Sequence, residues 1–349
     1  MPDGYRDRQQ GGGALSKLIL RRFFVSTKQG RYWFSVIAAV VTISALLCAD
    51  TFAQVRRISI GTADTGGVYY IYGGAIAKVI SANVAGTLAT AEVTPGAVDN
   101  VKMLQNGSID LAFTKSDVAL EAIKGVGPFA VTGKVQVRVL AVLYPDIAHV
   151  VVTPSINKLE DMKGKHISTS APGSGHEMVA LKLLEAAGVN PLKDFRRERI
   201  SLSESANAFK DRKLDGFFFA TGLPASAMLD LGATPGLSYK LLDVQSYLPA
   251  IIEKHGRIYY AAVIPKGTYR GQETDVKTIA VPVLLVAPEK MDEKLVYAVT
   301  KTLFEKKADL VAVHKEANKL TLKSAVALAE VLPFHPGATR YYKEKGVWK

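Results

Sequence analysis

The sequence predicts an α/β fold built from two lobes. Its 349 residues exceed one compact domain of about 100–200 residues. Strand and helix patterns alternate along almost all of the chain after residue 54, and this order favours a mostly parallel sheet with helices on both faces. The long apolar segment 276–287 is rich in β-branched residues and could return the chain to the first lobe. We therefore expect one lobe at 54–146 and 265–349, another at 147–264, and a ligand cleft at the hinge between them.

The first 53 residues have the features of a targeting segment. A basic region ends at Arg31, an uncharged stretch follows at 32–47, and small residues precede Gln54, which predicts cleavage after Ala53. We expect a signal peptide at 1–53 and a periplasmic protein. An uncleaved leader that tethers the protein to the membrane remains the alternative. Cys48 is the only cysteine, so the mature chain would have neither disulfides nor thiol chemistry.

The first lobe is expected to contain four strands and three helices. Apolar Ile71, Ala75, Ile76 and Val79 recur at helical spacing, and glycines follow the second and third helical segments, as at helix C-termini. The strands are predicted at 57–61, 88–93, 110–114 and 135–143, and the helices at 68–82, 98–106 and 117–124.

The second lobe repeats this alternation. Its clearest helix, 177–187, is amphipathic and is closed by Gly188, and its most apolar strand is 216–220. The strands are predicted at 149–153, 166–170, 199–202, 216–220 and 239–244, and the helices at 177–187, 205–213 and 226–231. After the returning strand 276–287, helices at 292–313 and 323–331 complete the chain.

The glycine-rich turn at 61–70 joins the first strand to the first helix. Such a turn presents unpaired backbone N–H groups and the positive end of a helix dipole, which suit a carboxylate. A P-loop requires Lys and then Ser or Thr after its last glycine, but Gly67 and Val68 occupy these positions. Ala63 breaks the G-x-G-x-x-G pattern of dinucleotide sites. We therefore interpret the turn as an anion-binding turn or as a tight packing turn.

Four further turns follow predicted strands and precede helices, at 94–97, 115–117, 171–177 and 221–224. Ser116 or Asp117 is a candidate N-cap of its helix. In 171–177, Pro172 and His176 occupy the two glycine positions of G-x-S-x-G, so this turn is not a nucleophile elbow. All of these turns would lie at the carboxyl ends of parallel strands, where open α/β sheets bind ligands.

Composition excludes several classes of function. The net charge is +12, and about +8 remains after the first 53 residues, so the body can attract anionic solutes. The lysines and arginines are scattered and are not interleaved with stacking aromatics, which disfavours nucleic-acid binding. The six histidines have no i, i+4 pairing and no metal-ligand spacing with Asp or Glu. We expect no metal, no cofactor and no catalytic residues.

A series of motifs resembles one protein family. Residues 60–70 (IGTADTGGVYY) are similar to the opening motif of the TAXI family, the solute-binding subunits of tripartite ATP-independent periplasmic (TRAP) transporters. The likeness continues in order over nearly all of the exported chain. It includes residues 96–100 (GAVDN), 110–113 (DLAF), 116–119 (SDVA), 143–145 (LYP), 162–165 (MKGK), 171–175 (APGSG), 210–215 (KDRKLD) and 335–342 (HPGATRYY).

The resemblance implies a type II periplasmic-binding fold, no ATP hydrolysis, inner-membrane partner subunits and small ligands such as glutamate, 2-oxoglutarate and glutamine. Carried over by position, it implies a pocket at Thr62, Thr65, Gly66, Tyr69, Tyr70, Thr94, Ser116, Asp117, Ser174, Gly175, His176, Gly222 and Pro224. Lys115 stands where the family usually has Gln and adds a cation to this set. His176 replaces a common Thr, and Asp64 lies in place of the usual glycine-rich spacing.

These observations predict a protein that captures a small anionic organic solute by closing two lobes on it and delivers the solute to a TRAP permease. A periplasmic sensor that presents the solute to a membrane receptor is the alternative, and gene neighbours would separate the two. An enzyme on the same fold is disfavoured, because no nucleophile–base pair or metal set is present in the sequence.

Overall fold

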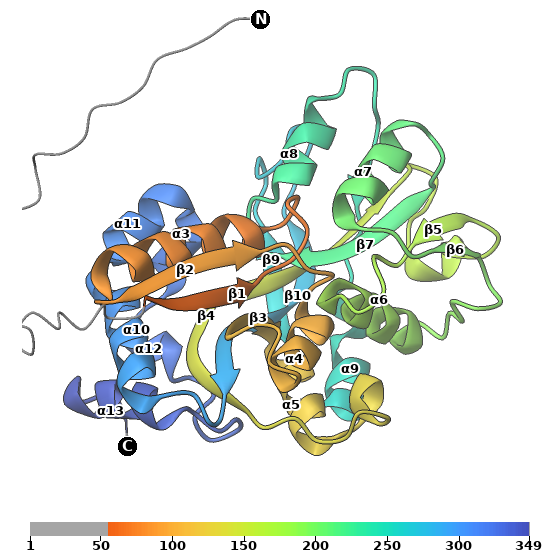
Figure 1. Cartoon of the computed structure of the whole chain (residues 1–349). Helices are drawn as coiled ribbons and strands as arrows, with labels where there is room; N and C mark the ends of the chain where they lie inside the picture. The colour runs from red at the N-terminus through yellow and green to blue at the C-terminus, as the bar shows by residue number, and fades with distance from the viewer. Residues whose placement is uncertain (1–54, 349) are drawn as a thin grey trace, which may run out of the picture. The chain divides into compact units, whose positions relative to one another are not determined.

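The computed structural model describes residues 55–348, which form a mixed α/β fold around one continuous sheet (Figure 1). The strand order is β2-β1-β3-β10-β4-β7-β5-β6, with β8 beside β4 and β9 beside β10. The strands are β1 (Arg56–Gly61), β2 (Thr87–Glu92), β3 (Leu111–Lys115), β4 (Val137–Val152), β5 (His166–Ser168), β6 (Arg196–Glu198), β7 (Gly216–Thr221), β8 (Lys240–Leu241), β9 (Tyr260–Ile264) and β10 (Val276–Pro288).

Helices cover both faces of the sheet. The α-helices are α3 (Val68–Asn83), α4 (Ala97–Gln105), α5 (Ser116–Lys124), α6 (Gly175–Ala186), α7 (Leu202–Lys210), α8 (Ser226–Ala233), α9 (Leu248–His255), α10 (Glu293–Glu305), α11 (Lys307–Val313), α12 (Leu322–Ala325) and α13 (Pro336–Glu344). Four 3₁₀ turns are η1 (Gly127–Phe129), η2 (Leu159–Met162), η3 (Gln245–Tyr247) and η4 (Lys315–Lys319).

The hydrophobic core divides at the middle of the sheet. One core gathers residues between 58 and 144 and between 283 and 342, joined by Met178, and we call residues 55–144 and 283–348 the first half. Two further clusters contain residues between 147 and 281, one with α6 and α9 and the other with α7 and α8. We call this part of the chain the second half. The expected α/β fold with two lobes is thereby confirmed. Within the segment 265–349, however, Tyr269, Val276 and Ile279 pack with the second half.

Strands β4 and β10 run through both halves and are the longest strands of the sheet. Where they cross between the halves, Pro145 faces Pro282, and neither can donate a backbone hydrogen bond. One step away, Val283 pairs with Tyr144 and Leu284 with Val142, so Leu143 is a β-bulge. The prolines and the bulge interrupt the regular ladder at this point, which we call the hinge.

Several sequence expectations about the elements were wrong. The predicted strands 135–143 and 149–153 are one strand, β4, because Pro145 interrupts the sequence pattern without ending the strand. The sheet is mixed and not mostly parallel, since β4 and β10 are antiparallel to all their neighbours. The strand predicted at 199–202 lies earlier in the chain, as β6, and α7 begins at Leu202, where Ser201 and Glu204 form a capping box.

The C-terminal part also differs from expectation. The helix predicted at 323–331 is only the short α12, and the predicted helix 292–313 is divided into α10 and α11. Helices α9 and α13 and strand β9 were not predicted. No helix in residues 55–348 is both long and apolar enough to span a bilayer. The predicted signal peptide lies outside the described residues.

Candidate functional site

The strand-to-helix turns of the two halves meet face to face. The N–H groups of Val98 and Asp99, in the first turn of α4, both donate to the Gly173 carbonyl at 3.1 and 3.2 Å. The Val68 N–H at the start of α3 donates to Thr221 Oγ1 at 3.1 Å. These contacts bring the carboxyl ends of parallel strands from both halves together, as the sequence predicted, and they hold the halves in direct contact.

A cavity of about 200 Å³ lies between these turns. Its polar lining comes from both halves, and Asp64 is the one formally charged side chain in it. The lining residues are Ala63, Asp64, Val93, Thr94, Pro95, Ser170, Ala171, Ser174, His176, Ser201 and Leu202. The volume suits a small organic solute, and the mixture of first- and second-half residues means that the solute would contact both halves.

Helix α6 begins at this cavity. Its N-cap Ser174 accepts the Glu177 N–H at 3.1 Å and donates to the Ala171 carbonyl at 2.7 Å. The helix dipole therefore places partial positive charge at the cavity wall. Ser170 has a positive φ of 74°, which is unusual for a residue with a side chain and often marks a functional turn.

Lys115 is fully buried behind Gly175 and does not line the cavity. Its ammonium lies 2.9 Å from Asp146 Oδ2 and donates to the Ala220 carbonyl at 3.2 Å. Lys115 therefore joins β3, the hinge strand β4 and the second-half strand β7. The cation that the sequence added to the pocket is already paired with a carboxylate.

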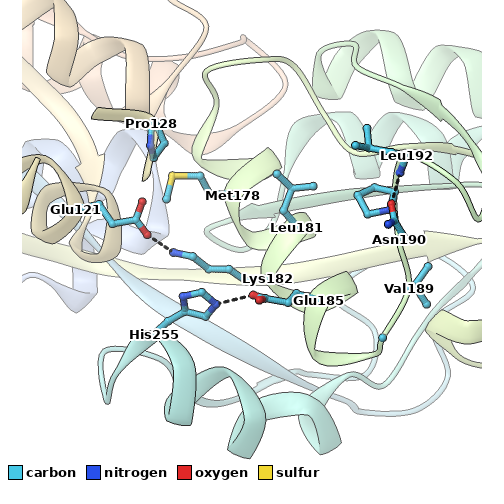
Figure 2. A pocket seen from close by; sticks show the side chains of 12 residues that line it. Glu121, Pro128, Met178, Leu181, Lys182, Glu185, Val189, Asn190, Leu192 and His255 are labelled. Carbon is cyan, nitrogen blue, oxygen red and sulfur yellow. Dashed lines mark hydrogen bonds and ion pairs between the residues drawn. The ribbon is translucent and has the colours of Figure 1, made fainter. Parts of the chain in front are cut away.

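Asp117 is the centre of a second network across the halves. It accepts a 2.7 Å hydrogen bond from Lys182 of α6 and another from the Tyr259 hydroxyl. Burial alone would raise the pKa of Asp117, but the Lys182 ammonium and these hydrogen bonds lower it below its usual range. Lys182 also bonds Glu121 of α5 at 3.0 Å, so α5 and α6 are linked (Figure 2). Lys115, and neither Ser116 nor Asp117, is the N-cap of α5, which corrects the sequence prediction.

Figure 2 shows the outer groove beside this network. Glu121 points to Lys182, and His255 of α9 points to Glu185 of α6, so the groove's charged groups are paired with one another. The groove measures about 550 Å³ and is larger than the cavity between the turns. Its walls lie outside the meeting turns, and none of the sequence-predicted site residues line it.

Several buried polar atoms have no hydrogen-bond partner in residues 55–348, and among them only His176 Nδ1 belongs to the cavity lining. Others are Tyr69 OH, Ser116 Oγ, Asp117 Oδ1, Tyr144 OH and Asp146 Oδ1. A buried polar group without a partner costs free energy, so such a group in a cavity lining is typical of a site that receives a polar ligand or water. Burial is also the main reason that the pKa of His176 is well below its usual range, which keeps the imidazole neutral at pH 7.

The structure places three of the fourteen predicted pocket residues in the cavity lining and eleven outside it. Thr62 is buried and donates to the Glu92 carbonyl at 2.6 Å. Thr65 is exposed, and Tyr70 is 37% exposed. Pro224 lies in the loop after β7, next to Leu223, whose N–H donates to Glu316. Thr94, Ser174 and His176 line the cavity directly. Gly66, Tyr69, Lys115, Ser116, Asp117, Gly175 and Gly222 are buried but do not belong to the lining.

Sequence reasoning missed several residues of this boundary. Asp146 and Lys182 contribute charges, and Ser170 and Ser201 line the cavity. Asp64 was noted only as a departure from the family pattern. Its carboxylate lines the cavity and accepts the Gly66 N–H at 2.8 Å and the Ser203 hydroxyl of the second half at 2.6 Å. In the described part of the chain, no group of three or more His, Cys, Asp or Glu is placed to hold a metal.

The sheet order, the two cores and the boundary site together define a type II periplasmic-binding fold. Residues 60–346 match the family model described as the NMT1-like family, and the chain belongs to that family.

Solved structures with a similar chain path include three binding or transport proteins. The alkanesulfonate-binding protein SsuA from Xanthomonas axonopodis pv. citri, bound to MOPS, is 16% identical over 82% of this chain and 83% of its own, with a TM-score of 0.45. A putative L-cystine ABC transporter from Listeria monocytogenes is 17% identical over 76% and 95%, with a TM-score of 0.45. An ancestral arginine-binding protein bound to arginine is 17% identical over 76% and 98%, with a TM-score of 0.46. At these identities and TM-scores, the ligands and partners of these proteins cannot be assigned to this chain.

Proposed function

We propose that this chain is an exported solute-binding protein that holds a small organic solute between its two halves and performs no chemistry on it. One observation carries the proposal. Turns from both halves meet around the cavity of about 200 Å³, and His176 Nδ1 in its lining has no hydrogen-bond partner in residues 55–348. A ligand that bonds to both halves stabilises the closed form through contacts that the open form cannot make.

The cavity's charges indicate the class of solute. The start of α6 favours a carboxylate, and Asp64 on the opposite half offers a carboxylate for an ammonium group. The neutral His176 adds a hydrogen-bonding group without a charge. We propose an amino acid such as glutamate in preference to 2-oxoglutarate, which has no ammonium group.

The finer assignment rests on the motif series that resembles the TAXI family. We propose that the two halves are the lobes of a TAXI-type subunit, divided at residues 145 and 282. In this proposal the leader exports the protein to the periplasm, and the closed form delivers its solute to the membrane subunits of a TRAP transporter.

Calorimetry of the full-length protein against L-glutamate, L-glutamine and 2-oxoglutarate tests the proposal, with small-angle scattering to follow compaction. We expect saturable binding, a smaller radius of gyration with the solute, and tighter binding of the amino acids. His176→Ala should weaken the affinity at least tenfold, about 1.4 kcal/mol, because it removes a cavity wall and a polar partner. His166→Ala, in β5 and outside the cavity lining, is the matched control. Saturable binding without compaction would contradict the two-lobed clamp.

A further inference from the structure

A second cavity lies directly on the hinge. Its volume is about 380 Å³, and its floor includes Leu143, Pro145 and Pro282. These residues interrupt the β4–β10 ladder, since the prolines face each other and Leu143 is a bulge. An occupant of this cavity would therefore contact the sheet where the two halves are joined.

The walls of the hinge cavity come from both halves. Lys319 of η4 and Leu328 belong to the first half, and Arg257, Ile258 and Tyr260 belong to the second. A single ligand of moderate length can contact both walls and the strands between them. The cavity shares no lining residue with the one between the turns, so the two sites are separate.

The lining combines apolar surface with positive charge. Val142, Leu143, Ile258 and Leu328 contribute aliphatic groups. Arg257 and Lys319 are exposed and form no ion pair with any described residue. No carboxylate lines the cavity, since Asp146 and Glu316 are buried and lie outside its lining.

Tyr260 adds a hydrogen-bond donor to the second-half wall. Burial and the nearby carboxylates Asp146 and Glu316 raise its pKa to about 12, so the hydroxyl keeps its proton at neutral pH. A phenol that stays protonated can donate to an anionic headgroup. Two unpaired cations, a hydroxyl donor and an aliphatic floor are complementary to a molecule with an acidic head and an apolar body.

We propose that the hinge cavity is a second binding site, for a small amphipathic anion such as an aliphatic carboxylate, whose acid group lies between Arg257 and Lys319. The apolar body would cover the aliphatic floor over the bulge and the proline pair. This site is independent of the solute site and does not require the proposed transport function.

Octanoate is a suitable probe, and octylamine is the same chain with the opposite charge. Calorimetry on the full-length protein should detect octanoate binding at least tenfold tighter than octylamine binding. The double variant Arg257→Gln/Lys319→Gln should weaken octanoate binding about tenfold, because both charges of the site are removed. Ala327→Trp, which places a large ring on a partly open wall, should abolish the binding.

Two controls make the result specific. Arg270→Gln/Lys294→Gln removes two exposed charges outside the cavity and should leave the affinity for octanoate within about twofold. Leu192→Asp changes the apolar groove of Figure 2 and should also have no effect. The proposal is overturned if octanoate does not bind, if octylamine binds equally well, or if only Leu192→Asp abolishes binding.

Discussion

Asp146 is a fully buried carboxylate at the hinge, and its surroundings disfavour the ionised form. Burial is the largest influence and raises its pKa from 3.8 to about 6, while the Lys115 ammonium at 2.9 Å only partly opposes this shift. Between pH 4 and 6 the folded protein therefore binds a proton at Asp146 that the unfolded chain has released. This proton stabilises the folded state at low pH, and the stabilisation is lost as the pH rises through 6.

Replacement of Asp146 by Asn tests this single group. The amide is neutral at every pH, so the free energy of unfolding of the wild type, relative to the variant, should fall by about 2 kcal/mol between pH 4 and 6. Urea unfolding at steps across this range gives the two curves. Asp211→Asn, at the exposed pair with Lys213, should stay within about 0.5 kcal/mol of the wild type throughout. Curves for Asp146→Asn and wild type that run parallel would show that Asp146 is charged at all these pH values.

The Lys115–Asp146 ion pair is a part of the site that could not be predicted from the sequence. Lys115 was correctly placed at the end of a strand beside the boundary, but its partner Asp146 is 31 positions away and sits within a strand, where nothing in the local pattern marks it. Turns can be located from glycines and strand patterns because their chemistry is local. Pairing between buried charges is decided by the tertiary packing and could not be predicted from one sequence.

At the scale of elements, Gly175 decides how closely α6 approaches the first half. A Cβ at this position would lie 2.6 Å from Lys115 Cε and 2.9 Å from Ala97 Cβ at the start of α4. Lys115 cannot move aside easily, because Asp146 and the Ala220 carbonyl both hold its ammonium. The absence of a side chain at Gly175 is therefore required for the close contact between the start of α6 and the first half.

Gly175→Ala should consequently hold α6 away from α4 and Lys115 and disfavour closure. We expect solute affinity to fall about tenfold, since overpacking of this kind costs roughly 1–3 kcal/mol. Calorimetry with the best solute of the panel measures the loss. Gly74→Ala is the control, because it lies within α3 with nothing near its added methyl, and it should stabilise the protein by about 0.5–1 kcal/mol without changing affinity. Equal affinity in wild type and Gly175→Ala would mean that this contact is not needed for binding.

The elements that were predicted well are those whose signals are local. Helix α3 has a regular apolar spacing, and α5 ends at Gly125 in the left-handed conformation, so both were placed within about one residue. Strand β4 was predicted as two strands because Pro145 breaks the local pattern, although the strand continues through it. Strand β10 lies between β3 and β4 and is antiparallel to both. This position depends on long-range pairing, which the alternation of strands and helices does not reveal.

At the scale of the whole molecule, the two halves are in direct contact across their boundary. Hydrogen bonds and ion pairs cross the boundary at Val68–Thr221, Asp64–Ser203, Lys115–Ala220 and Asp117–Lys182. In the proposed clamp, these contacts separate to admit a solute to the cavity between the turns. The hinge at Pro145 and Pro282 is the place where such a separation requires the least change in the sheet.

A disulfide across the boundary tests whether the halves separate during binding. A Cβ at Gly67 would lie 3.5 Å from Thr221 Oγ1, and Gly67 has an ordinary φ of −104°, so Gly67→Cys with Thr221→Cys can form a bond of near-normal geometry. With Cys48→Ser as background, the oxidised protein should lose solute binding, because the empty cavity is locked shut. Reduction should restore most of the binding, which calorimetry before and after reductant measures, and each single-cysteine variant should respond to neither treatment. If the oxidised protein binds solute as the reduced protein does, the halves do not need to open, and entry to the cavity follows another path.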